Sequence, residues 1–313
     1  MPMKAPSFLQ GIRLVLILAV LAALYALALP ASAGDAPGLG EAGERPVELP
    51  LVLVPTSGSA AYYITHELNQ GVPQTSGVFY LSEGSPEGEY RLISARVHYT
   101  VLSVDGDAVR LVARAQPVDP WTGELLEPSR WEATYLLAPD GTNLESSDEV
   151  PFPYSDLMQP GWLAEWSAIP RPLLPAGPLL PGDEWTGPGN PEWGDFFELV
   201  PETPVEGLFL GWVETEAGPA AHIHEGLEAW ERYLVPIAEG IDGVETSEVY
   251  LSADHWLVPG DFPYGTERWV YVDYFVVVGP STGAPEGVEG EFSVTMELAF
   301  SAVRDANDAV WLE

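Results

Sequence analysis

Apolar and polar residues alternate along much of the chain, and the clearest case runs from Tyr90 to Val104. From Ile93 to Val101 every second residue is apolar, with serine, arginine, histidine and threonine between. A period of two is typical of a strand with one buried face and one wet face. The Asp105-Gly106 turn and the renewed alternation from Val109 to Ala115 predict a long hairpin.

The same alternation predicts strands on both sides of the middle of the chain. Trp131 to Leu137 is closed by a Pro139-Asp140-Gly141 turn, and Glu291 to Val303 is the last alternating segment. Shorter β-rich runs are Leu51–Val54, Tyr62–Leu68, Val78–Leu81, Gly207–Val213, Ala220–His224, Glu248–Leu251 and Arg268–Val278. We expect an all-β fold with minor α structure, either a curved antiparallel sheet or an open half-barrel of two similar halves.

Two segments have apolar residues nearer to helical spacing. Tyr154 to Ile169 predicts one short helix, interrupted by Pro160-Gly161, that packs an apolar face on the sheet. Leu227 to Ile237 fits a helix as well as a strand, although Pro236 limits a helix there. These segments are the one or two short helices of the expected fold.

A proline-rich joint interrupts the alternation near the middle of the chain. Four prolines from Pro172 to Pro181 fix φ and remove backbone donors, so this run is neither a helix nor a central strand. Pro181-Gly182-Asp183 predicts a turn that leads into a new strand at Trp185. A short match between residues 133–140 and 248–254 is the one sign that the two halves are related.

The N-terminus has the three parts of a secretory signal. Lys4 and Arg13 precede the apolar run Leu14 to Leu29, and Pro30-Ala-Ser-Ala33 supplies the small residues of a cleavage site. The alternative is an uncleaved anchor, but the run is short for the ~20 residues of a membrane span. We expect an exported protein of the periplasm, cell surface or extracellular space, with no membrane span after cleavage. The expected divisions are a signal peptide (1–33), a flexible tether (34–48), a first half (49–171), the joint (172–185) and a second half (186–313).

Charge narrows the classes of function. Removing the two basic residues of the signal leaves 10 of 12 bases against 47 acids, a formal charge of −37, and all ten bases are arginines. Lysine chemistry is therefore excluded from the processed chain. Nucleic acid is not an expected partner, because it requires a basic surface. The chain has no cysteine, so it holds neither disulfides nor a lipidation site at the cleavage point.

The joint also carries a resemblance. Leu174-Pro175, Pro178, Pro181-Gly182-Asp183 and Trp185, between two β-rich halves, resemble uncharacterised exported bacterial β-rich proteins with a central L-P-x-x-P-[LV]-x-P-G-D-x-W motif. More distantly, the layout is similar to lipoprotein-carrier half-barrels. That resemblance implies a curved sheet over an apolar cavity, and it brings no catalytic residue.

Two motifs suggest chemistry. Gly279-Pro-Ser-Thr-Gly283 matches a nucleophile elbow, but the Ala284-Pro-Glu-Gly287 that follows cannot open the required helix, so a hairpin loop is favoured. His222 and His224 lie two residues apart, which on a strand puts both imidazoles on one face as weak candidates for a metal pair, with Glu225 or Glu228 as a third ligand. The alternative is the polar side of an ordinary strand. We expect no cofactor and no catalytic residue.

The expected function is non-enzymatic binding of an apolar or amphipathic molecule, such as a lipid-like compound, or of an envelope protein. The candidate residues of a ligand cavity are Trp131, Tyr135, Trp162, Trp166, Phe292 and Phe300. Two alternatives stay open: an acidic glycan-binding or glycan-cleaving protein, and a purely structural envelope component. An exposed row of tryptophans would favour glycan; most tryptophans fall in apolar phases that suggest the core, and Trp121, Trp193 and Trp256 are the ones expected to be exposed.

Overall fold

The computed structural model describes residues 55–79, 88–126, 131–138, 143–146, 172, 174–175, 177–187, 204–238 and 241–305. Their strands are β1 (Ser59–Gln70), β2 (Gln74–Gly77), β3 (Glu89–Asp105), β4 (Ala108–Val118), β5 (Trp131–Leu137), β6 (Asn143–Ser146), β7 (Glu184–Gly187), β8 (Val205–Thr215), β9 (Gly218–Ala238), β10 (Ile241–Leu257), β11 (Gly265–Val278) and β12 (Gly290–Arg304). A 3-10 turn, η2 (Pro280–Thr282), lies between the last two strands.

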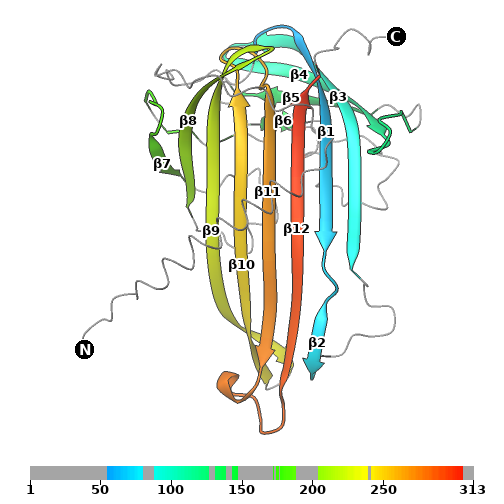
Figure 1. Cartoon of the computed structure of the whole chain (residues 1–313), viewed down its shortest axis with the longest axis vertical. Coiled ribbons are helices and arrows are strands. Elements are labelled where there is room, and N and C mark those ends of the chain that lie inside the picture. Colours follow the sequence, from blue (N-terminus) through cyan, green and yellow to red (C-terminus); the bar gives the residue numbers. More distant parts are fainter. Residues whose placement is uncertain are drawn as a thin grey trace. The chain divides into compact units, whose positions relative to one another are not determined.

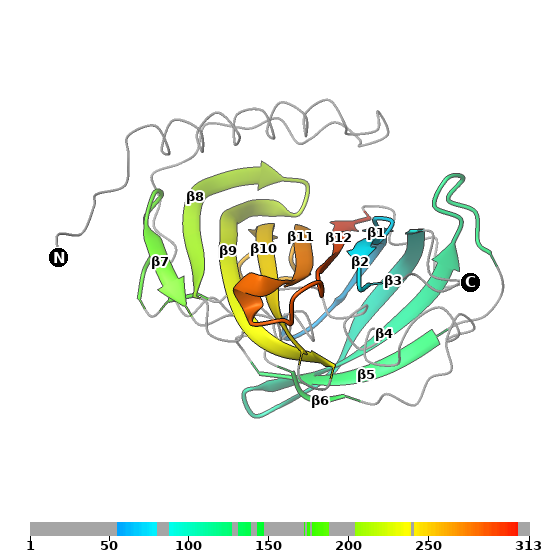
Figure 2. The same ribbon diagram turned by 90° about the horizontal axis from the view of Figure 1, so that it is seen from below.

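The strands form one antiparallel sheet in the order β6-β5-β4-β3-β1-β12-β11-β10-β9-β8-β7. β2 continues the line of β1 along β12. The sheet curves strongly and is not closed into a barrel (Figures 1 and 2). The all-β prediction of a curved antiparallel sheet is therefore confirmed. The first and last long strands, β1 and β12, pair at its centre.

Alternation along each strand separates two faces, which we call the core face and the open face. In β10 the residues Val249, Leu251, Ala253, His255 and Leu257 are all buried, whereas the residues between them are half-buried. The matching register carries the core face across neighbouring strands, because residues with Cα atoms opposite each other point to the same side. The open face is the opposite side of the same strands.

The core face holds two large apolar clusters. The first spans β1, β3, β4, β5 and β12, and its aromatic centre is Tyr62, Tyr99 and Phe300, closed at one end by Phe262 of the β10–β11 loop. The Tyr62 hydroxyl donates a hydrogen bond to the Pro263 carbonyl of the same loop. The second cluster lies on β8 to β11, and Met296 and Leu298 of β12 pack against it.

The joint packs on a third cluster. Leu180 to Asp183 form the predicted turn, with Gly182 at a φ of 90° and the Asp183 amide 2.9 Å from the Leu180 carbonyl. Leu179 is buried with Phe209 and Ile223, while Leu174 and Trp185 pack against them. The new strand predicted at Trp185 is β7, which begins at Glu184 and forms one edge of the sheet.

The structure resolves one open choice and corrects one expectation. Leu227–Ile237 is part of β9, not a helix, because each of its residues through Pro236 pairs with β10. The strand expected at Glu248–Leu251 is longer than its sequence pattern indicates, because β10 continues through Asp254 and His255 to Leu257. Gly279–Gly283 is the predicted hairpin connection, between β11 and β12. The predicted helix at Tyr154–Ile169 lies outside the described residues.

Candidate functional site

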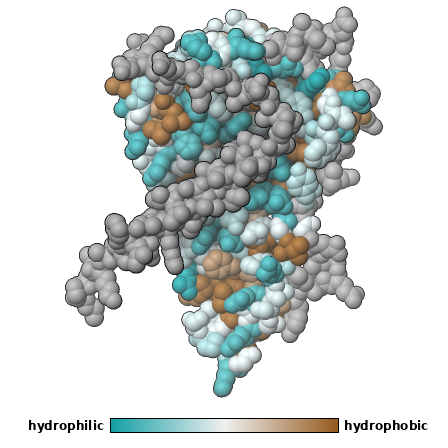
Figure 3. Space-filling view, viewed as in Figure 1, coloured by the Kyte–Doolittle hydropathy of each residue, from teal (hydrophilic) through white to brown (hydrophobic). Residues whose placement is uncertain are grey.

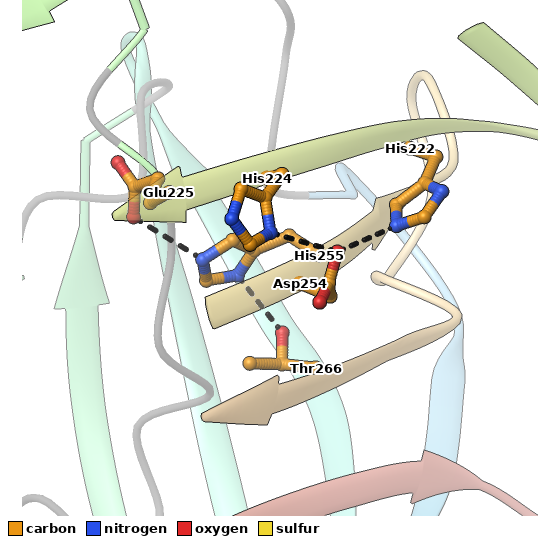
Figure 4. A network of polar contacts seen from close by, with 6 residues as sticks. All are labelled: His222, His224, Glu225, Asp254, His255 and Thr266. Carbon is orange, nitrogen blue, oxygen red and sulfur yellow. Dashed lines mark hydrogen bonds and ion pairs between the residues drawn. The ribbon is translucent and has the colours of Figure 1, made fainter. Parts of the chain in front are cut away.

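The two histidines suggested as metal ligands do lie on one face of β9, and both contact the same carboxylate. His222 Nε2 is 2.8 Å and His224 Nδ1 is 3.2 Å from Asp254 Oδ1 on β10 (Figure 4). His224 and Asp254 are opposite each other in the register, which explains the short approach. The ring of His222 also stacks on Trp256, with centroids 5.0 Å apart.

This pairing changes the acidity of both partners. Burial alone would raise the pKa of Asp254, but the hydrogen bonds with His222 and His224 outweigh it and hold the pKa well below its ordinary value. The hydrogen bond with Asp254 raises the pKa of His224 against the opposing effect of burial. The carboxylate is therefore held charged, and it favours the protonated form of His224.

The suggested third ligands do not join this pair. Glu225 points to the core face, where it is buried and its Oε2 lies 3.2 Å from His255 Nε2 (Figure 4). Glu228 shares the open face with His224 but is opposite Tyr250, four residues along the strand. Among the described residues, no group of three histidines or carboxylates is placed to hold a metal ion.

The core face carries a second polar group. His255 Nδ1 lies 3.2 Å from Thr266 Oγ1, and its other ring nitrogen contacts Glu225. A hydroxyl, an imidazole and a carboxylate in a row are the elements of a nucleophilic triad. All three side chains are at most 1% exposed, so a substrate in solution has no access to them. The row therefore serves to satisfy buried polar atoms.

The ligand-cavity candidates are spread over the sheet. Tyr135 and Phe300 are buried in the first cluster of the core face, and Phe292 is half-buried near the start of β12. Trp131 begins β5. Trp162 and Trp166 lie outside the described residues. The cavity stays a prediction.

An aromatic row on the open face is the feature that sequence reasoning missed. Trp269 and Tyr271 stack on β11 with centroids 5.9 Å apart and an interplanar angle of 17°. The ring centroids of Tyr271 and of Tyr250 on β10 are 6.2 Å apart. Trp230 on β9 is opposite Glu248, on the same face as Tyr250, and is 59% exposed. We call Trp230, Tyr250, Trp269 and Tyr271 the aromatic row.

Small residues leave space beside the row. Trp269 is opposite Ser252 on one side and Ala299 on the other, and Ser252 is in turn opposite Gly226. At Gly226 the atoms nearest to an added Cβ would be 3.9 and 4.0 Å away, the second of them Nε2 of His224. The rim of the Trp269 ring therefore faces short side chains on both neighbouring strands.

Carboxylates surround the tyrosines of the row. Tyr250 is opposite Glu228, and Tyr271 is opposite Glu297. Burial, followed by the nearby charges of Glu248 and other acids, raises the pKa of Tyr250. Burial, followed by the charge of Asp273, likewise raises the pKa of Tyr271. Both phenols stay neutral hydrogen-bond donors and acceptors near neutral pH.

The space-filling view shows the setting of these strands. Polar and apolar surface alternate on the face in view, and apolar surface gathers over the lower parts of β9 and β10 (Figure 3). The exposed apolar side chains of β9 include Leu234 at 69%. Trp121, expected from the sequence to be exposed, is 76% exposed in the β4–β5 connection.

Comparisons with known proteins do not assign this chain to a family. No family model and no curated protein matches the chain. Among solved structures it is similar to a Bacteroides fragilis protein that is described as exported and has a YmcC-like fold. The identity is 12%, and the match covers 78% of this chain and 97% of that chain at a TM-score of 0.20. A likeness at this score carries no argument, so the resemblance of the joint motif to exported proteins stays a prediction.

The described residues contain no helix with the length and hydropathy of a membrane span. Export likewise stays a prediction from the N-terminal sequence.

Proposed function

We propose that this is an exported, non-catalytic protein that binds a glycan on the open face of β9 to β12. The observation that carries the proposal is the aromatic row, which sets two tryptophans and two tyrosines on the solvent side of adjacent strands. One face of a pyranose ring presents C–H groups, and aromatic rings offer large apolar faces for such groups to stack on.

Polar groups beside the rings supply the second half of sugar recognition. Carboxylates accept hydrogen bonds from sugar hydroxyls, and tyrosine hydroxyls both donate and accept. Glu228, Glu248 and Glu297 border the tyrosines in the register of the sheet. Because the rings stand on paired central strands, they are held in place before the ligand arrives, which lowers the entropy cost of binding.

The burial of the core face also favours the open face as the place of the ligand. Tyr62, Tyr99, Tyr135 and Phe300 are all less than 5% exposed, so these large apolar side chains offer little surface to a guest. On the open face, by contrast, Trp230 is 59% exposed.

The test is calorimetric titration of the purified chain with a panel of soluble hexasaccharides that differ in sugar and charge. At least one should bind, and Trp269→Ala should weaken that binding by on the order of tenfold, since losing ~60 Å² of buried apolar contact at ~25 cal/mol per Å² costs about 1.5 kcal/mol. Trp121→Ala is the matched control, because Trp121 is exposed in a connection outside the row.

The row could also serve stability alone, because aromatic pairs stabilise sheets by ~0.2–1 kcal/mol. A Trp269→Ala protein that melts at a lower temperature but binds every sugar as the parent does would show that the row is only structural.

A further inference from the structure

We propose that the glycan bound by the aromatic row carries free amino groups, as in a polymer of de-N-acetylated hexosamine. This inference rests on the proposed function and adds the chemical class of the ligand. The reason is the charge around the rings, where acidic side chains far outnumber basic ones.

The open face of β9 to β12 presents many carboxylates. In the register of the sheet they are Glu228 on β9, Glu248 and Asp254 on β10, Glu267 and Asp273 on β11, and Glu291 and Glu297 on β12. Glu248 and Asp273 are opposite each other on adjacent strands. Like charges so close favour any ligand that brings a compensating cation.

Few cations on the same face offset these acids. Arg232, on β9, is the one arginine on the open face of these four strands, four residues beyond Glu228. His222 and His224 already contact Asp254. Arg268 belongs to the core face, where its guanidinium lies 5.7 Å from the centroid of the Phe300 ring.

The aromatic rings strengthen the same preference. A protonated amine is attracted to the face of tryptophan or tyrosine by the ring quadrupole, in addition to the carboxylates nearby. The raised pKa values of Tyr250 and Tyr271 agree with this one-sided field, because burial and neighbouring acids both oppose a negative phenolate. An anionic glycan, such as a uronate polymer or a phosphate-bearing chain, meets uncompensated repulsion at the same place.

The test compares three hexasaccharides on the full processed chain: a hexamer of glucosamine, its N-acetylated counterpart and a hexamer of galacturonate. The glucosamine hexamer should bind on the order of tenfold or more tightly than the acetylated one at low salt. The preference should shrink as sodium chloride is raised from 0.05 to 0.5 M, since salt screens exposed charges.

Variants separate a site from general attraction to an acidic protein. Glu228→Gln with Asp273→Asn should remove most of the preference for the amine, whereas Glu214→Gln, an exposed acid of β8, should not. Trp269→Ala should weaken binding of the glucosamine hexamer by on the order of tenfold or more, and lysine hexapeptide should compete poorly. Retained binding in Trp269→Ala would overturn the inference.

Two further outcomes tell the inference and the proposed function apart. Equal or tighter binding of the acetylated or galacturonate hexamer, lost in Trp269→Ala, would refute the amine preference and leave glycan binding in place. Failure of all three hexamers and of the wider panel would refute both.

Discussion

At the scale of single residues, Asp254 organises the polar end of the open face. One of its oxygens contacts two imidazoles from the neighbouring strand, and the lowered pKa of the acid and the raised pKa of His224 describe the same attraction. The sequence indicated that the two histidines share a face, because their spacing of two shows it directly. It did not indicate Asp254 as their partner, since the pairing depends on the register of β9 against β10.

Removing the charge of Asp254 should destabilise the protein in a pH-dependent way. The folded-state pKa of His224 is raised. The contribution of His224 to the free energy of unfolding is therefore fully present below the ordinary histidine pKa, and it is lost as pH rises through the folded-state pKa. Asp254→Asn should therefore lower the free energy of unfolding by about 1–2 kcal/mol near pH 6 and by less near pH 9.

Urea unfolding at the two pH values measures this difference, and NMR titration of His224 should show its pKa falling in the variant. The control is Asp107→Asn in the exposed turn between β3 and β4. An equal loss of stability at both pH values would contradict the account.

At the scale of elements, the joint and β9 show what a sequence pattern can and cannot predict. The turn and the strand after the joint were predictable, because proline and glycine restrict the backbone locally. β9 was ambiguous for a physical reason: apolar residues lie on both of its faces, with Leu227 buried and Trp230 and Leu234 exposed. Their combined spacing imitates a helix.

The close packing of Trp185 at the start of β7 gives a prediction for Gly207. Trp185 and Gly207 are opposite each other, and an added Cβ at Gly207 would lie 2.2 Å from the Trp185 ring. Gly207→Ala should force the indole off the third cluster and cost about 1–3 kcal/mol. Gly279→Ala should be nearly neutral, since nothing lies within 4 Å of its added Cβ.

Thermal melting of the two variants, with the fluorescence of Trp185 assigned by Trp185→Phe, checks this close contact. Equal melting temperatures for Gly207→Ala and Gly279→Ala would mean that Trp185 does not rest on Gly207.

At the scale of the whole molecule, the sequence predicted the fold class but not the aromatic row. The fold class was predictable because alternation recurs in strand after strand. The aromatic row was not, because Trp230, Tyr250 and Trp269 come to lie on one face only through the pairing of three strands. Along the sequence, most tryptophans fell in apolar phases and suggested core residues. Only the register shows that Trp230, Tyr250 and Trp269 share the open face.

The formal charge of −35 for the full sequence predicts a strong response to salt. Repulsion among exposed carboxylates destabilises the compact state, and 0.1 M salt screens charges beyond ~10 Å. The melting temperature should therefore rise by several degrees from 0.01 to 0.5 M sodium chloride. Calorimetry measures it, and a melting temperature that does not change with salt would show that the acids are already paired or well dispersed.

The central claim is that ligand binds on the aromatic row, and fluorine NMR of protein labelled with 5-fluorotryptophan tests it most directly. Each resonance is assigned by a Trp→Phe substitution. A hexasaccharide that binds in calorimetry is then titrated into the labelled protein. The account predicts shifts for Trp269 and Trp230, with Trp121 and the packed Trp185 unchanged. Shifts confined to Trp185 or Trp212, both of which pack against the third cluster, would contradict it.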